Sequence, residues 1–148
     1  MERLVIEGGT SLSGAIRVHG AKNAALPILA ASVMAKGTHV ISNVPDLLDI
    51  DVMLQILRWI GCAASRNGDR LTVNTRPLHL SRVPEDLMRQ MRSSIFLMGP
   101  LLARFGQVQI YQPGGCAIGE RKIDLHLKGL RALGAEIEES HDTIRCRA

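Results

Sequence analysis

A glycine-rich segment in the second half of the chain carries the residues best suited to chemistry. It reads Pro113-Gly114-Gly115-Cys116-Ala117-Ile118-Gly119, and Arg121 and Lys122 follow it. Its glycines permit positive φ and a close approach of the backbone to a ligand. The two cations favour the thiolate of Cys116 and attract an anion. The segment therefore predicts an anion-binding loop with a reactive thiol. The alternative is an idle cysteine in a turn, and the loop alone favours neither interpretation.

The same segment has the spacing of a phosphate-binding P-loop between Gly114 and Gly119. Glu120 and Arg121 come next, where that motif requires Lys followed by Ser or Thr to contact phosphate and magnesium. We therefore exclude nucleoside triphosphate hydrolysis. The loop retains the features of an anion site beside a thiol.

Three polar residues outside this loop are also candidates for binding an anion. Lys22 and Asn23 stand at the expected start of the first helix, where unpaired N–H groups and the helix dipole favour negative charge. Arg92 borders an apolar run. The alternatives are an ordinary solvated first turn, which residue type alone favours, and an arginine that reaches to solvent. The histidines show no metal-ligand spacing, so we expect no metal site. The sequence does not decide whether His126, near the loop, is a surface residue or part of the site.

The elements that position these residues form a unit that occurs twice. One constant shift aligns two helix faces that each end in glycine, namely Ile50, Leu54, Leu57, Ile60 and Gly61, and Ile123, Leu127, Leu130, Leu133 and Gly134. It also aligns two apolar helices through Pro27 and Pro100, and two strands at 69–73 and 142–146. Further strands are expected at 39–42 and 107–111.

Each unit therefore reads helix, strand, helix, strand, strand, over about 22–80 and 81–148. Residues 4–7 and 15–18 predict a further pair of strands outside the repeat. Units of this kind need neighbours to cover their sheets and usually occur three or more times. We therefore expect that further units are missing from this chain.

Composition limits the classes of function. The chain has 148 residues, 46% of them hydrophobic, which suffices for one domain with its own core. Lys and Arg exceed Asp and Glu by 18 to 14, which favours an anionic ligand. Aromatic residues are too few for a stacking surface, which disfavours nucleic-acid binding.

The three cysteines have no paired spacing, which disfavours a disulfide framework and favours a reducing, cytoplasmic setting. We expect no membrane association, because the sequence shows neither a signal peptide nor an apolar run long enough to span a bilayer.

Together these segments resemble the N-terminal portion of the UDP-N-acetylglucosamine enolpyruvyl transferases (UDP-N-acetylglucosamine 1-carboxyvinyltransferases). The similarity covers the whole chain and rests on the cysteine loop and on Gly20-Ala21-Lys22-Asn23-Ala24-Ala25-Leu26-Pro27, Asn43-Val44-Pro45, Met91-Arg92-Ser93-Ser94 and Asp124-Leu125-His126. The related enolpyruvyl transferases of the shikimate pathway lack this cysteine loop, which makes the combination specific.

The resemblance implies transfer of the enolpyruvyl group of phosphoenolpyruvate to the 3′-hydroxyl of UDP-N-acetylglucosamine, with loss of phosphate and without a cofactor. This is the first committed step of peptidoglycan synthesis. The resemblance implies that Cys116 is catalytic, as a proton donor to C3 of phosphoenolpyruvate and as the target of fosfomycin. It implies that Lys22, Arg92 and Arg121 bind phosphoenolpyruvate or its phosphate, and that Asn23 helps to hold both substrates.

The resemblance also assigns one stretch to the uridine nucleotide, namely Arg121, Lys122, Ile123, Asp124 and Leu125. Lys122 stands where the family usually has proline, which predicts an altered nucleotide affinity with the chemistry retained.

The fold implied is an incomplete inside-out α/β (α+β) barrel. The family has two domains of three units each. By resemblance, residues 1–21 are strands that join the second domain, and residues 22–148 supply two units of the first. The missing second domain supplies an acidic residue and another arginine, so we expect little or no turnover by this chain alone.

Two other interpretations are kept. The first is a non-catalytic remnant that binds the sugar nucleotide or a protein partner through the edge of the incomplete barrel. The second is a basic nucleic-acid-binding module, which salt-sensitive retention of DNA or RNA would reveal.

Overall fold

The computed structural model describes residues 3–114 and 122–148. The first unit contains α1 (Lys22–Ala31), η1 (Ser32–Met34), β1 (Thr38–Ile41), α2 (Leu48–Trp59), β2 (Ala63–Asn67) and β3 (Arg70–Asn74). The second contains α3 (Glu85–Gln90), η2 (Arg92–Leu97), α4 (Met98–Phe105), β4 (Gln107–Tyr111), α5 (Asp124–Ala132), β5 (Glu136–Glu139) and β6 (Thr143–Arg147). The order of elements confirms the predicted repeat.

The two units also share one sheet topology. Each sheet has three antiparallel strands, in the order β1-β3-β2 in the first unit and β4-β6-β5 in the second. Leu71 on the central strand β3 pairs with Ile41 and Arg66. Ile144, at the equivalent position of β6, pairs with Ile110 and Glu139. The register therefore repeats, and the predicted helix stops Gly61 and Gly134 both have positive φ.

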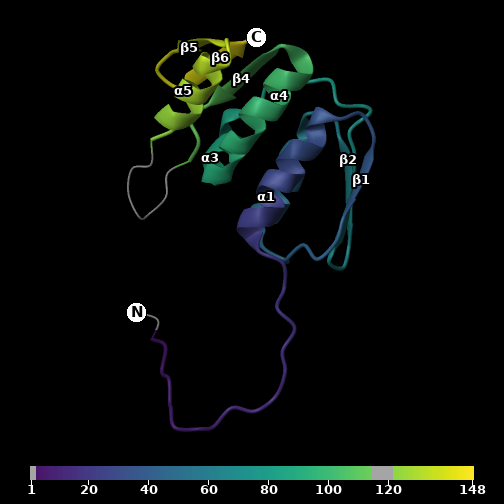
Figure 1. Ribbon diagram of the computed structural model, residues 1–148, viewed down its shortest axis with the longest axis vertical. Helices are drawn as coiled ribbons and strands as arrows, with labels where there is room; N and C mark the ends of the chain where they lie inside the picture. Colours follow the sequence, from purple (N-terminus) through teal and green to yellow (C-terminus); the bar gives the residue numbers. More distant parts are fainter. Residues whose placement is uncertain (1–2, 115–121) are drawn as a thin grey trace.

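The helices α1 and α4, one from each unit, lie between the two sheets (Figure 1). The helix α1 packs against α2 and η2, and η1 packs against α4. The segment α1–η1 therefore packs against the segment η2–α4, with α1 beside η2 and η1 beside α4. The two segments run side by side in the same direction. Their buried side chains form the centre of the core, including Leu26, Leu29, Leu97, Met98 and Leu101. Helices inside and sheets outside agree with the predicted α/β architecture.

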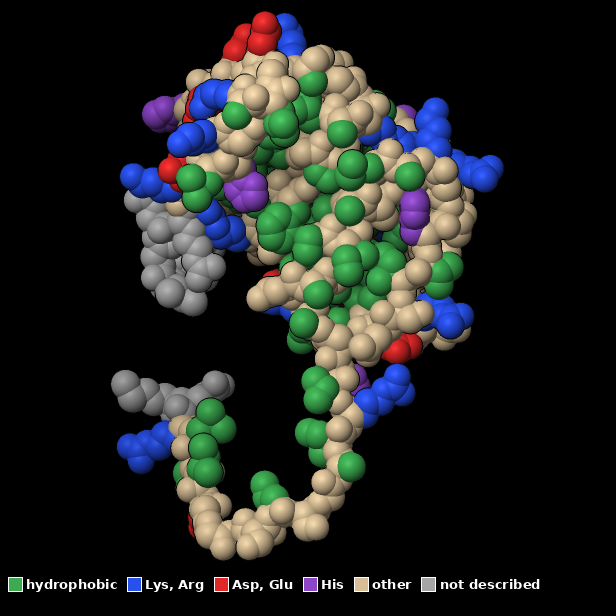
Figure 2. Space-filling view, viewed as in Figure 1, with side chains coloured by type: hydrophobic (Ala, Val, Ile, Leu, Met, Phe, Trp, Pro, Cys, Tyr) green, Lys and Arg blue, Asp and Glu red, His purple; other side chains and the backbone are tan. Residues whose placement is uncertain are grey.

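The helical layer is open on one face. Figure 2 shows hydrophobic side chains gathered over the part of the molecule where α1 and α4 lie. Ile28 on α1 is 50% exposed, and Met34 in η1 is 57% exposed. Among the described residues, no helix is long and apolar enough to cross a bilayer.

The first helix of the second unit differs from the prediction. A single helix containing Arg92 is expected from the sequence, but the chain breaks at Met91, whose φ of −149° and ψ of 147° are extended. The buried hydroxyl of Ser94 donates to the carbonyls of Met88 at 3.0 Å and Met91 at 2.8 Å. A serine that binds nearby carbonyls competes with helical hydrogen bonding. Arg92 therefore begins the 3₁₀ segment η2 after a break.

Residues 3–21 form neither of the two strands expected at 4–7 and 15–18. Strands need a partner to satisfy their backbone groups, and no described strand lies beside this segment. Its apolar side chains are solvated, with Leu4 95% and Ile16 89% exposed. Figure 2 shows the segment extending away from the body of the molecule. The assignment of residues 1–21 to a second domain stays a prediction.

Two equivalent positions of the second helix in each unit are covered in the first unit and exposed in the second. In α2, which packs against α1 and α3, Val52 is 3% exposed and the following Ile60 is 0% exposed. The equivalent residues by the repeat are Leu125 on α5, 75% exposed, and Leu133 just after it, 85% exposed. These two leucines line an apolar groove of about 400 Å³ together with Phe96. The same sequence pattern thus has different packing partners in the two units.

An arginine from the second unit joins the two units away from the helix starts. Arg104 on α4 donates from Nη1 to the carbonyl of Val33 at 2.8 Å and from Nη2 to the carbonyl of Thr75 at 2.7 Å. Its Nη1 also donates to the carbonyl of Ala35 at 3.2 Å. One guanidinium therefore satisfies three carbonyls of the first unit, because its donors are held in a fixed fork.

The unequal burial of the repeated face predicts unequal costs of truncation. We expect Ile60→Ala to lower the free energy of unfolding by about 3 kcal/mol, because it leaves a cavity in the core. The matched change Leu133→Ala should alter it by less than about 0.5 kcal/mol, because the side chain is already solvated. Urea denaturation followed by circular dichroism measures both. Equal losses at the two positions would contradict the observed packing.

The contacts of Arg104 predict that it stabilises the junction of the units. We expect Arg104→Gln to lower the free energy of unfolding by about 2 kcal/mol, since it removes charge-assisted hydrogen bonds to partly buried carbonyls. The control is Arg76→Gln, which should have almost no effect, because this arginine is exposed and its side chain makes no hydrogen bond or ion pair within the described residues. A loss of similar size in both variants would indicate a general effect of charge.

Candidate functional site

Two predicted cations lie at the same end of the helical layer. Lys22 begins α1 and Arg92 begins η2. Because α1–η1 and η2–α4 run side by side in the same direction, both starts lie at the same end of the molecule. Both side chains are partly exposed, which leaves them accessible to a ligand. The structure therefore brings together two of the residues that the sequence proposed for binding an anion.

The connection between β1 and α2 and the first turn of α2 each hold the start of α1 at one point. Gly20 donates its N–H to Oδ1 of Asn43 at 3.2 Å, and Nζ of Lys22 lies 2.7 Å from Oδ2 of Asp49. A Cβ atom at position 20 would stand 1.8 Å from the carbonyl oxygen of Asn43, so only glycine fits there. Asn23, the other predicted residue of this turn, is exposed. Neither Asn43 nor Asp49 was predicted as a site residue.

The segment from α3 to η2 anchors both ends of the cysteine loop. Gly114 donates its N–H to the carbonyl of Met88 at 3.1 Å, and a Cβ there would lie 1.9 Å from the carbonyl oxygen of Arg89. At the other end, Nη2 of Arg92 donates to the carbonyl of Lys122 at 3.0 Å. Cys116 and Arg121 lie outside the described residues. The flanks of their loop are nevertheless fixed beside Arg92.

Ser94 is a supporting residue that sequence reasoning missed. Its two hydrogen bonds, to Met88 and Met91, hold the break that separates α3 from η2. The break directs Arg92 to Lys122 and leaves the carbonyl of Met88 for Gly114. The available signal was the pair of serines after Arg92, because serine favours such local bonds to the backbone.

The stretch predicted to contact a nucleotide divides into two environments. Lys122, Ile123 and Asp124 line a pocket of about 290 Å³. Its other lining residues are Gln112, Leu127 and an ion pair of Arg131 with Glu139. Ile123 is 8% exposed, so it can offer mainly backbone groups. Leu125 lies in the apolar groove instead, beside His126, whose ring centroid is 6.5 Å from that of Phe96.

Arg92 contacts Lys122, the residue that stands where the family usually has proline. Arg92 binds the main-chain carbonyl of Lys122, and proline also has a carbonyl group. The anchoring of Arg92 therefore does not depend on the side chain at position 122. The side chain of Lys122 instead adds a positive charge to the pocket that it lines.

The two described cysteines are poorly suited to nucleophilic or acid–base chemistry. Cys62 and Cys146 are buried and free. Burial raises the pKa of the Cys62 thiol to about 11, although Arg104 opposes the shift. Burial also raises the pKa of the Cys146 thiol. Both thiols remain protonated near neutral pH, which leaves Cys116 as the candidate for the reactive thiol.

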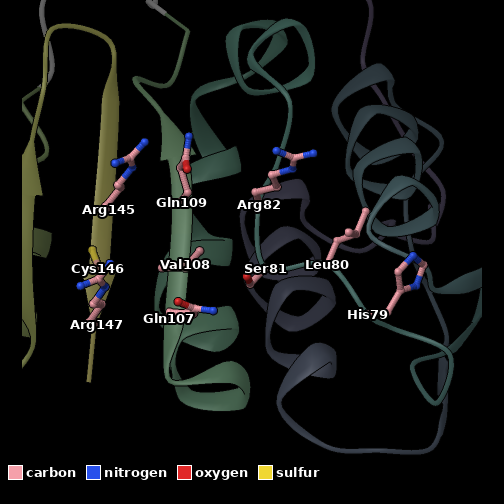
Figure 3. A pocket seen from close by; sticks show the side chains of 10 residues that line it. All are labelled: His79, Leu80, Ser81, Arg82, Gln107, Val108, Gln109, Arg145, Cys146 and Arg147. Atoms are coloured by element: carbon pink, nitrogen blue, oxygen red, sulfur yellow. The ribbon is translucent and has the colours of Figure 1, made fainter.

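A larger pocket, of about 460 Å³, lies beside β4 where the first unit passes into the second (Figure 3). Arg145, Gln109 and Arg82 lie in one row across its wall, because Gln109 pairs with Arg145 on β6 and with Arg82 in an isolated parallel bridge. Its lining includes no residue that the sequence proposed for the site. We therefore assign the candidate site to the helix starts and the cysteine loop.

Known proteins resemble this chain over nearly its whole length. Residues 6–147 match the family described as EPSP synthase (3-phosphoshikimate 1-carboxyvinyltransferase). The chain is 54% identical over 147 residues to UDP-N-acetylglucosamine 1-carboxyvinyltransferase 2 of Caldanaerobacter subterraneus, covering 99% of this chain and 35% of that protein. It is 48% identical to the UDP-N-acetylglucosamine 1-carboxyvinyltransferase of Halorhodospira halophila, covering 100% and 36%. The chain thus spans about a third of these relatives.

Solved structures show the same fold. The enolpyruvyl transferase NikO from Streptomyces tendae superposes with a TM-score of 0.79 at 25% identity, covering 95% of this chain and 31% of that one. The EPSP synthase of Acinetobacter baumannii superposes with a TM-score of 0.61 at 19% identity, covering 88% and 31%. These superpositions confirm the predicted fold class. The match over residues 6–147 shows that the chain belongs to the EPSP synthase (3-phosphoshikimate 1-carboxyvinyltransferase) family.

Proposed function

We propose that this chain is part of an enzyme that transfers the enolpyruvyl group of phosphoenolpyruvate to the 3′-hydroxyl of UDP-N-acetylglucosamine. The supporting observation is that Lys22 and Arg92 lie at the same end of the helical layer, where both flanks of the Cys116 loop are anchored. Relatives at 54% and 48% identity are named for this sugar nucleotide and this reaction. The reaction is the first committed step of peptidoglycan synthesis and serves cell-wall biogenesis, cell shape and cell division.

The positive charges proposed for the site suit an anionic substrate. Phosphoenolpyruvate carries a phosphate and a carboxylate, and Lys22, Arg92 and Arg121 would hold them through charge-assisted hydrogen bonds. Asn23 would help to hold both substrates. As the phosphate leaves with the electrons of the C2–O bond, the same cations would stabilise its charge.

Cys116 would supply the proton. The 3′-hydroxyl oxygen bonds to C2 of phosphoenolpyruvate and passes its proton to the acidic residue that the resemblance implies for the second domain, while C3 takes a proton from the Cys116 thiol, which becomes a thiolate. The resulting tetrahedral intermediate then returns a proton from C3 to that thiolate and releases the phosphate from C2, which restores the double bond. A thiol in this role must be protonated before attack and within reach of C3.

The uridine nucleotide would lie along Arg121 to Leu125. The pocket of about 290 Å³ at Lys122, Ile123 and Asp124 provides space beside this stretch. The remaining groups of the reaction would come from a second domain of the same enzyme, because the chain spans about a third of its relatives. We place the protein in the cytoplasm, where reduced cysteines such as Cys62 and Cys146 are the usual state.

A second candidate function is binding without catalysis, either of the sugar nucleotide or of a protein partner. The observation that favours it is the apolar groove at Phe96, Leu125 and Leu133, which other residues do not cover in the described structure. Calorimetric titration with UDP-N-acetylglucosamine separates the two functions. Tight binding without phosphate release would support the second function.

The cysteines should differ in their reaction with a thiol reagent. At pH 7.5 we expect iodoacetamide to label Cys116 and to leave Cys62 and Cys146 unlabelled in the folded chain, since both buried thiols have raised pKa values. Labelling of Cys62 should increase as the pH rises toward 11, because the thiolate forms on deprotonation. Peptide mapping by mass spectrometry identifies the labelled sites. Preferential labelling of Cys62 at pH 7.5 would refute the assignment.

Fosfomycin tests the proposed site directly. We expect a covalent adduct on Cys116 when UDP-N-acetylglucosamine is present, because the thiolate opens the epoxide ring of the inhibitor held by the cations. Intact-mass measurement and peptide mapping detect the adduct, and Cys116→Ser is the control that should show none. If the chain stays unmodified while the full-length Caldanaerobacter relative reacts, this chain alone does not assemble the site.

A further inference from the structure

Among the residues that the structure describes, one carboxylate, that of Asp49, forms an ion pair with the ammonium group of Lys22. Nζ of Lys22 lies 2.7 Å from Oδ2 of Asp49, and the two side chains are 42% and 32% exposed. Asp49 belongs to the first turn of α2, which also contains Asp51. An ion pair with this much exposure contributes little to folding stability. The pair therefore calls for a role other than stabilising the fold.

The internal repeat supplies a second observation about position 49. The shift that aligns Ile50 with Ile123 also aligns Asp49 with Lys122. At position 122 the main-chain carbonyl accepts a hydrogen bond from Arg92, the cation that begins η2. Asp49 and Lys122 thus occupy equivalent positions, and each binds a cation that begins a helical segment. Asp49 binds Lys22 at the start of α1, and Lys122 binds Arg92 at the start of η2. One unit uses a carboxylate and the other uses a backbone carbonyl.

Holding these cations has a physical consequence for binding. A lysine side chain has four carbon–carbon bonds to order, whereas the guanidinium of arginine is planar and pre-organised. A lysine that is ordered before the ligand arrives loses less side-chain entropy on binding, which raises affinity. The fixed carboxylate of Asp49 can provide this order, and the partial exposure leaves donors of the ammonium group for a ligand.

We propose that Asp49 is a positioning residue that orients the ammonium group of Lys22 toward the phosphate or carboxylate of the bound substrate. This role rests on the proposed function of Lys22 as an anion-binding residue. A simple counter-ion would have the opposite effect on affinity, because its removal would free Lys22 for the ligand. The direction of the change in affinity therefore decides between the two roles.

The test is a double-mutant cycle on the whole chain, with inorganic phosphate as the probe. Amide chemical shifts of Lys22 and Asn23 in ¹H–¹⁵N spectra report binding. We expect Asp49→Asn to raise the dissociation constant about fivefold. In a Lys22→Gln background the same change should have no effect, because Asp49 acts through Lys22. Asp49→Glu, which keeps the carboxylate, should recover part of the affinity.

Asp51→Asn is the matched control, since Asp51 lies in the same turn and makes no ion pair with any other described residue. Its dissociation constant should equal that of the unmodified chain. The thermal midpoint of Asp49→Asn should also stay unchanged, which separates positioning from unfolding. Equal or tighter phosphate binding by Asp49→Asn refutes the positioning role. If Lys22→Gln leaves binding unchanged, or the unmodified chain shows no shift, the anion-binding role of Lys22 fails instead.

Discussion

The side-by-side packing of α1–η1 with η2–α4 is the constraint on which the rest of the structure depends. Its driving force is burial of apolar side chains from both units, including Leu26, Leu29, Leu97 and Leu101. Arg104 fixes the ends of these segments by binding carbonyls of the first unit. Since the segments run in the same direction, their first residues share one end of the molecule. A hydrophobic contact thus decides where the cations lie.

The two units build this end of the molecule in related ways. In the first unit, Asn43 in the connection after β1 and Asp49 in the first turn of α2 hold the start of α1. In the second, the α3–η2 segment holds the loop after β4 through Met88 and Arg92. The second loop is longer and carries the candidate thiol. A duplicated scaffold can thus carry a short connection after β1 in one unit and a loop with a candidate reactive cysteine after β4 in the other.

The structure also shows where the repeat is unequal. The helix α2 has neighbours on its apolar face, whereas Leu125 and Leu133 of the second unit remain exposed. The sheets on the outside do not differ in this way, since both have three strands in the equivalent order. The exposed residues therefore reflect packing between helices, because each helical face depends on a neighbouring unit to cover it.

The sequence by itself determined the repeat, the strands within the two repeated units, the helix-ending glycines and the residue types suited to an anion and a thiol, because these depend on local periodicity and chemistry. Only the tertiary structure decided that Lys22 pairs with Asp49, that Ser94 breaks the helix before Arg92, and that Met88 anchors Gly114. These contacts join side chains and carbonyls whose approach follows from how helices pack. No local pattern specifies that approach, because packing depends on the combined shape of elements distant in the chain.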